Sequence, residues 1–237
     1  MSRRDEYREA LRALPSGWEA YLQEHSGLPG PRANLELVEA VADEGDEELF
    51  RRLIATDDEY LVVCGLVGLG RLLAEGRRDL LPELHGAASD GRWRVREGVV
   101  LGLQRLGDRD VPRLFAAVEP WADGNDLERR AAAAAVCEPR FLREGANALL
   151  ALDLLDALTE SVAGTADRRA DEFRVLRKGL GYCWSVAVAA LPEAGKARME
   201  RWLASDDRDV RWIMRENLKK ARLARMDPEW VARMQTR

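Results

Sequence analysis

Apolar residues recur at helical spacing in the stretch SDGRWRVREGVVLGLQRL, residues 89–106. The recurring apolar residues are Val95, Val99, Leu103 and Leu106. Because they are three or four positions apart, they lie on one face of an α-helix. The Ser-Asp-Gly segment that opens the stretch is a turn and helix-cap signal. The pattern therefore predicts one amphipathic helix that begins after a turn.

The same pattern returns along the chain. Close copies lie at residues 56–73 and 205–223, and looser copies lie at 123–137 and 171–187. The equivalent positions are Val62, Val95, Glu128, Leu176 and Val210, so the steps are 33, 33, 48 and 34 residues. A period in the thirties with two helices in each unit is typical of a helical solenoid.

The breaks in this pattern predict how the chain is organised. We expect a single repeat array over residues 1–237, with an N-terminal cap at 1–32, repeats at 33–225 and a C-terminal cap at 226–237. The long third step predicts an insertion near 138–169, which includes an apolar helix at 146–162 and a polar loop at 164–167. Asp227-Pro228 predicts the start of the closing helix, since proline suits the first helical turn.

Two of the copies share a more specific motif. It is Asp90, then Val95-Arg96, Gly98-Val99 and Leu103; the other copy has Asp206, then Val210-Arg211, Met214 and Leu218. This motif resembles the second helix of HEAT repeats, over residues 33–225. The third copy departs from it, because Glu128-Arg129 replaces Val-Arg and an alanine run replaces the larger apolar residues. The resemblance implies an all-α, right-handed α-solenoid of about five HEAT-like helix pairs with capping helices at both ends.

Composition and charge narrow the class of protein. Hydrophobic residues form 46% of the chain and charged residues 33%, a globular composition. Three scattered cysteines suit a reducing compartment, and no signal peptide or membrane span is present in the sequence, so we expect a soluble, cytoplasmic monomer. The net charge is −5, but residues 1–167 carry −12 and residues 168–237 carry +7. The basic third is a candidate surface for an anionic partner.

The repeat register predicts which side chains line a concave groove. In each unit the second helix should turn its core face inward and a second stripe, about half a turn away, toward the groove. The groove residues expected from this register are Tyr60, Trp93, Glu97, Gln104, Arg130, Arg174, Lys178, Tyr182, Arg208, Trp212, Arg215 and Lys219. Aromatic residues beside Arg or Lys suit a protein partner or a nucleic-acid backbone. Alternatively, the two tryptophans pack between repeats, and Arg96 and Arg211 pair with Asp residues of adjacent units.

The sequence holds no pattern of a known catalytic or metal site. Two isolated histidines and the absence of zinc-site spacings, a P-loop or a nucleophile elbow predict no metal, no cofactor and no catalytic residue. The segment GLVGLG at 65–70 has the wrong spacing for a dinucleotide-binding loop and is better explained by close helix packing. The favoured function is a non-catalytic binding or scaffold module.

A second resemblance keeps an enzymatic alternative open. Residues 172–184 and 91–106 are similar to helices of the HEAT-like DNA glycosylases that excise alkylated purines. That resemblance implies DNA-backbone contacts by Arg96, Arg177 and Tyr182 or Trp184, and a carboxylate that stabilises positive charge on the sugar. The family's Trp-Trp-Asp segment has no counterpart here, and Trp121-Ala122-Asp123 is a poor substitute. The alternative function is thus a DNA-binding repair protein.

Overall fold

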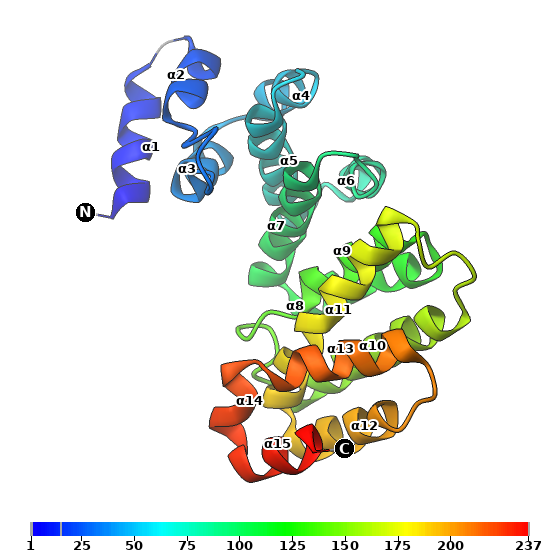
Figure 1. Cartoon of the computed structure of the whole chain (residues 1–237). Coiled ribbons are helices and arrows are strands. Elements are labelled where there is room, and N and C mark those ends of the chain that lie inside the picture. The colour runs from blue at the N-terminus through cyan, green and yellow to red at the C-terminus, as the bar shows by residue number, and fades with distance from the viewer. Residues whose placement is uncertain (1, 15, 237) are drawn as a thin grey trace. The chain divides into compact units, whose positions relative to one another are not determined.

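The computed structural model describes residues 2–14 and 16–236 and is all-helical (Figure 1). Over these residues it contains fifteen α-helices and two short 3-10 helices, and no β-strand. The predicted all-α class is confirmed. No helix among the described residues is both long and apolar enough to cross a membrane.

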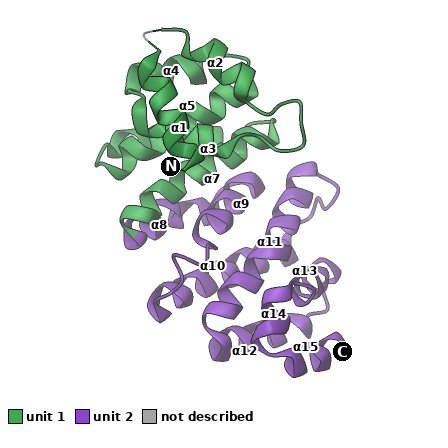
Figure 2. Cartoon of the chain, turned by 90° about the vertical axis from the view of Figure 1, so that its left-hand side faces the viewer, with its two compact units in different colours: residues 1–110 green, residues 111–237 purple. Residues whose placement is uncertain are grey.

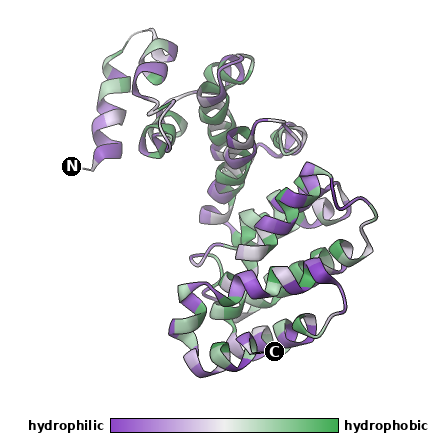
Figure 3. Ribbon diagram, viewed as in Figure 1, coloured by the Kyte–Doolittle hydropathy of each residue, from purple (hydrophilic) through white to green (hydrophobic). Residues whose placement is uncertain are grey.

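The chain divides into two compact units, residues 1–110 and residues 111–237 (Figure 2). The helices of unit 1 are α1 (Arg3–Ala13), α2 (Trp18–His25), α3 (Leu35–Glu44), α4 (Glu47–Ile54), α5 (Glu59–Ala74), α6 (Leu81–Ala87) and α7 (Trp93–Arg109). Helices α5 and α7 lie side by side, α4 packs on α5, and α1 packs on α3. Helix α5 is hydrophobic along almost its whole length (Figure 3), and α3, α4 and α7 pack on it and bury most of its residues.

Glycines set the close approach of α5 to its neighbours. A Cβ atom on Gly70 would lie 2.3 Å from the Cα atom of Gly102 in α7, and a Cβ on Gly68 would lie 2.3 Å from the Phe50 ring in α4. Only a residue without a side chain fits at these contacts. The glycine-rich segment at 65–70 therefore packs helices together, as its spacing predicts.

Unit 2 is also built of helices joined by short connections. Its helices are α8 (Val111–Val118), α9 (Asp126–Val136), α10 (Gly145–Gly164), α11 (Asp171–Ala190), α12 (Pro192–Leu203), α13 (Arg208–Leu218), α14 (Ala221–Met226) and α15 (Pro228–Gln235). Helix α11 packs between α9 and α13, and α10 and α12 also pack on it. The predicted long helix and polar loop of the insertion are present as α10 and the segment that follows it.

Within the described part of the chain, side-chain capping explains seven of the helix starts. Asp58 accepts hydrogen bonds from the first-turn N–H groups of α5, Asp207 does so for α13, and Asp227 accepts from the Trp230 N–H at the start of α15, which begins at the predicted Asp227-Pro228. The predicted cap of α7 needs correction, because its N-cap is Arg92. The Asp90 carboxylate instead accepts from the Arg92 backbone N–H and guanidinium.

The sequence pattern also predicts one continuous helix over residues 210–224, which is wrong. Helix α13 ends at Leu218, and Lys220 is extended before α14 begins. The buried side chain of Asn217 lies just before this break, with its amide donating to Leu180 O and its oxygen accepting from Ser185 N of α11. The expected single repeat array stays a prediction.

Candidate functional site

Exposed cations and one tyrosine cover adjacent helices of unit 2. Arg174, Lys178 and Tyr182 are four residues apart on α11, so they form one solvent-exposed stripe opposite its buried face. Arg208, Arg215 and Lys219 form an exposed stripe at the neighbouring helix α13. We call these residues, together with Lys220 and Arg222, the basic surface.

Tyr182 connects the α11 stripe with two cations that follow α13, Lys220 and Arg222. Its side chain is 47% exposed, and the Arg222 guanidinium both donates to its hydroxyl oxygen and lies 4.8 Å from its ring centroid. The Lys220 ammonium lies 5.8 Å from the same centroid. Cations within about 6 Å of a ring face are attracted by its quadrupole, so the tyrosine holds two positive charges at one place.

Most charges of the basic surface remain available to a partner. Three of the cations have a local ion pair: Arg174 with Asp171 at 2.8 Å, Lys219 with Glu216, and Arg208 with Asp209 at 3.5 Å. Exposed pairs such as the first two contribute little and exchange easily. Lys178 and Arg215 are exposed and have no ion pair among the described residues. The arrangement can neutralise an extended anion.

A partly buried ion-pair network, centred on the buried Asp209, lies beside the basic surface. The Arg177 guanidinium lies 4.2 Å from the Trp212 ring centroid and donates to Asp209 at 2.5 Å. Arg168 donates to the other oxygen of Asp209 at 2.9 Å and to Asp207 at 2.5 Å. Burial acts to raise the pKa of Asp209, but the hydrogen bonds from Arg177 and Arg168 outweigh it and hold that pKa below its ordinary value. Trp212 is half-buried, and its ring packs against Arg177 of α11. This packing between helices agrees with the alternative in which the tryptophan does not line a groove.

The prediction for unit 1 needs two corrections. Tyr60, expected in the groove, is only 2% exposed, because its ring is packed in the core and its hydroxyl donates to Asn34 O at 2.8 Å. Burial accordingly raises the pKa of Tyr60. Gln104 is also buried, which a polar amide tolerates because it has a partner.

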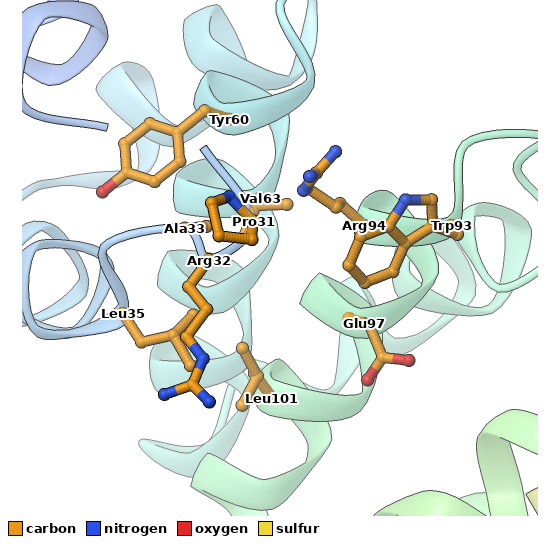
Figure 4. A pocket seen from close by; sticks show the side chains of 10 residues that line it. All are labelled: Pro31, Arg32, Ala33, Leu35, Tyr60, Val63, Trp93, Arg94, Glu97 and Leu101. Atoms are coloured by element: carbon orange, nitrogen blue, oxygen red, sulfur yellow. The ribbon is translucent and has the colours of Figure 1, made fainter. Parts of the chain in front are cut away.

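Trp93 and Glu97 line a pocket of about 340 Å³, and Tyr60 is also among its lining residues (Figure 4). One wall is α7, the floor is α5, and the opposite wall is the segment 31–35. Trp93 is 53% exposed, and its predicted place in a groove stays a prediction. The structure therefore places Tyr60, Trp93 and Glu97 at a pocket in unit 1 and six of the predicted groove residues in the basic surface of unit 2, whereas Gln104, Arg130 and Trp212 lie in neither.

Other predicted contacts are local. Arg130 of α9 packs against α11, where a Cβ on Gly179 would lie 3.0 Å from its Cγ. Among the described residues, Arg96 and Arg211 do not pair with Asp side chains of neighbouring helix pairs. Instead, Arg96 donates to Asp90 O at 2.6 Å and Arg211 donates to Ser205 O at 2.6 Å. Each arginine thus bonds to the turn before its own helix, and the two arginines occupy equivalent positions in the two copies of the sequence motif. Sequence reasoning missed Arg222 as a site residue. Arg222 lies just after the break that follows α13, which was not predicted, and it contacts Tyr182 from there.

The residues implied by the glycosylase resemblance have structural partners. Arg96 and Trp184 are buried, and the Trp184 indole N–H donates to Thr159 at 3.0 Å. Trp121 is buried as well. Two carboxylates lie beside arginine and tryptophan side chains. Asp209 accepts from Arg168 and Arg177 with its two oxygens. Asp156 accepts from the Trp202 indole N–H at 2.6 Å and from Arg198 and Arg201, so both of its oxygens also accept from arginines. Among the described residues, no group of three or more His, Cys, Asp or Glu side chains could hold a metal ion.

Comparison with known proteins gives little further information. No protein-family model matches the chain, and no curated protein matches it. A crystal structure of an engineered protein from the Northeast Structural Genomics Consortium is similar to 92% of this chain over 98% of its own, with 15% identity and a TM-score of 0.40.

Proposed function

We propose that the chain is a non-catalytic binding module of the HEAT-repeat type, and that its basic surface binds the backbone of a nucleic acid. The 33- and 34-residue steps and the side-by-side packing of α5 with α7 and of α9, α11 and α13 support the repeat interpretation. Concave faces of such arrays commonly bind extended partners.

The observation that carries this proposal is the exposed charge of α11, α13 and α14. Lys178 and Arg215 have no ion pair among the described residues, and Tyr182 holds Lys220 and Arg222 beside them. Arg, Lys and Tyr side chains are common donors to phosphate oxygens. Because the aromatic rings are already covered by cations, the surface offers charge and hydrogen bonds rather than a free stacking platform, which favours backbone contacts over base recognition.

A binding comparison tests the proposal. Fluorescence anisotropy would follow labelled duplex DNA and labelled poly-glutamate against the wild type and the triple variant Lys178→Ala/Arg215→Ala/Lys219→Ala. We expect the duplex to bind in the micromolar range at low salt and the variant to bind at least about tenfold more weakly, since each lost contact costs a fraction of a kcal/mol to about 1 kcal/mol.

The matched control is Arg3→Ala/Arg78→Ala/Arg143→Ala, which removes three other exposed cations and changes the net charge equally. It should bind like the wild type. Tighter binding of poly-glutamate than of the duplex would assign the surface to an acidic protein segment instead. Equal weakening by both triple variants would contradict a localised site.

Asp209 beside Arg177 and Trp212 is one observation that bears on the glycosylase alternative; Asp156, which accepts from Trp202, Arg198 and Arg201, is occupied in the same way. A carboxylate that stabilises a developing cation must face the substrate, whereas both oxygens of Asp209 are occupied by arginines and its side chain is buried. We therefore expect no release of alkylated bases from DNA. Base release by the wild type that is lost in Asp209→Asn, with the fold retained, would establish the enzymatic function instead.

A further inference from the structure

The pocket of unit 1 has exposed apolar lips. Leu35 is 48% exposed and Trp93 is 53% exposed, and the two side chains lie on opposite walls (Figure 4). Val63 and Leu101 line the space between them. Large apolar side chains that are half exposed and face one pocket are unusual on a surface and mark a binding site for an apolar group.

Of the charged side chains that line this pocket, Arg94 and Glu97 already have interaction partners within the chain, whereas Arg32 has no ion pair among the described residues. Arg94 stacks on Trp93, 4.5 Å from its ring centroid, and pairs with Glu59 at 3.0 Å. Glu97 also has an interaction partner. Arg32 is exposed and has no ion pair among the described residues. The charge that remains available at the lip is therefore a guanidinium, which best complements a carboxylate.

We propose that this pocket is a docking site for a linear segment of a partner protein that presents an apolar side chain beside a carboxylate. The apolar side chain enters between Leu35 and Trp93, and the carboxylate accepts hydrogen bonds from Arg32. The openness of the lips favours a protein segment over a small molecule, because only a partner that covers the pocket also removes Leu35 and Trp93 from water. Tryptophan and arginine are the residue types that dominate binding energy at such sites.

This inference is separate from the proposed binding of nucleic acid, because it concerns other residues in the other unit. A chain with both sites would bind a protein segment through unit 1 and an anionic backbone through unit 2. Each site can fail without affecting the other, since the variants that test them share no residue.

The probe is a fluorescein-labelled peptide in which a Leu-Phe pair is flanked by Asp residues, followed by anisotropy with the full chain. We expect saturable binding, weakened about 30-fold by Trp93→Ala, which is the effect of losing an aromatic anchor worth about 2 kcal/mol. The control Leu149→Ala removes an exposed apolar side chain of unit 2 and should leave binding unchanged. Circular dichroism would show that the variants keep their helical content.

Charge reversal distinguishes recognition from general stickiness. Arg32→Glu should weaken the Asp-flanked peptide about tenfold and strengthen a Lys-flanked version of the same peptide, whereas Arg78→Glu, an exposed control in the same unit, should do neither. Absence of saturable binding, or binding that is insensitive to Trp93→Ala or to Arg32→Glu, would overturn the proposal. Tight binding of 2-naphthoate together with no binding of the peptide would also overturn it, in favour of a small-molecule site.

Discussion

Asp209 shows how one residue supports the surface above it. Its carboxylate accepts from Arg177 and Arg168, which fixes Arg177 over the Trp212 ring and ties the segment before α11 to the start of α13. A buried carboxylate is costly unless its charge is matched, and here two guanidinium groups match it. The network thus positions the helices that carry the basic surface, and Arg208 of that surface also lies 3.5 Å from an Asp209 oxygen.

This network makes the stability of the protein depend on pH. Because the folded-state pKa of Asp209 lies below the unfolded value of about 3.9, the ion pairs stabilise the protein above that value and their contribution is lost as the pH falls through the folded-state pKa. Asp209→Asn should lower the free energy of unfolding by about 3 kcal/mol at neutral pH. The difference from the wild type should shrink below about pH 4.

Urea denaturation between neutral pH and about pH 3 measures this difference directly. The matched control is Asp206→Asn, an exposed neighbour without an ion pair among the described residues, and it should change stability little at any pH. A destabilisation by Asp209→Asn that stays the same at every pH would argue against the ion pairs as its cause.

Periodicity predicted the exposure of individual residues well where one helix face is open. Lys178, Arg215 and Lys219 lie half a turn from a buried stripe and are exposed, as the register requires. The same register failed for Tyr60, because the segment leading into α3 covers that side of α5 and accepts the tyrosine hydroxyl at Asn34 O. A helical repeat pattern describes one helix at a time, so it contains no information about a covering segment from elsewhere in the chain.

At the scale of elements, the contact between α5 and α7 depends on the absence of side chains. Gly70→Ala would place a Cβ against the backbone of Gly102, which neither helix can move away from cheaply. We expect a loss of about 2 kcal/mol in the free energy of unfolding. Gly86→Ala in α6, where a Cβ meets nothing within 4 Å, should instead stabilise the helix by about 0.5 kcal/mol.

Chemical denaturation of both variants tests this explanation of the glycine-rich segment. Opposite signs for the two Gly→Ala changes are the expected outcome, because helix propensity is improved in both and only Gly70 has a neighbour in the way. A Gly70→Ala variant as stable as Gly86→Ala would mean that the helices are not held at this distance.

Most helices could be predicted from apolar spacing and breaker residues, and their ends less well. The end of α13 was missed because the apolar spacing continues through Leu223, while the helix stops where Asn217 turns its side chain to the backbone of α11. That tertiary hydrogen bond has no local sequence signal. The contact of Arg222 with Tyr182, which completes the candidate site, follows from this break and could not be predicted either.

At the scale of the whole molecule, charge distinguishes the two units. Residues 1–110 carry 15 Lys and Arg against 22 Asp and Glu, and residues 111–237 carry 22 against 20. An acidic unit repels a polyanion while the other unit, close to neutral overall, gathers its cations on α11, α13 and α14. The charge asymmetry was readable from the sequence; the boundary between the units was not, because the apolar period continues across it.

The measurement that tests the central claim most directly is the salt dependence of duplex DNA binding, for the wild type and for Lys178→Ala/Arg215→Ala/Lys219→Ala. Phosphate contacts predict that log affinity falls linearly with log salt concentration, and that losing three contacts makes the slope shallower by about 2.7. The control triple Arg3→Ala/Arg78→Ala/Arg143→Ala should keep the wild-type slope. The absence of binding at low salt, or a slope that is the same in wild type and variant, would contradict a nucleic-acid-binding function of the basic surface.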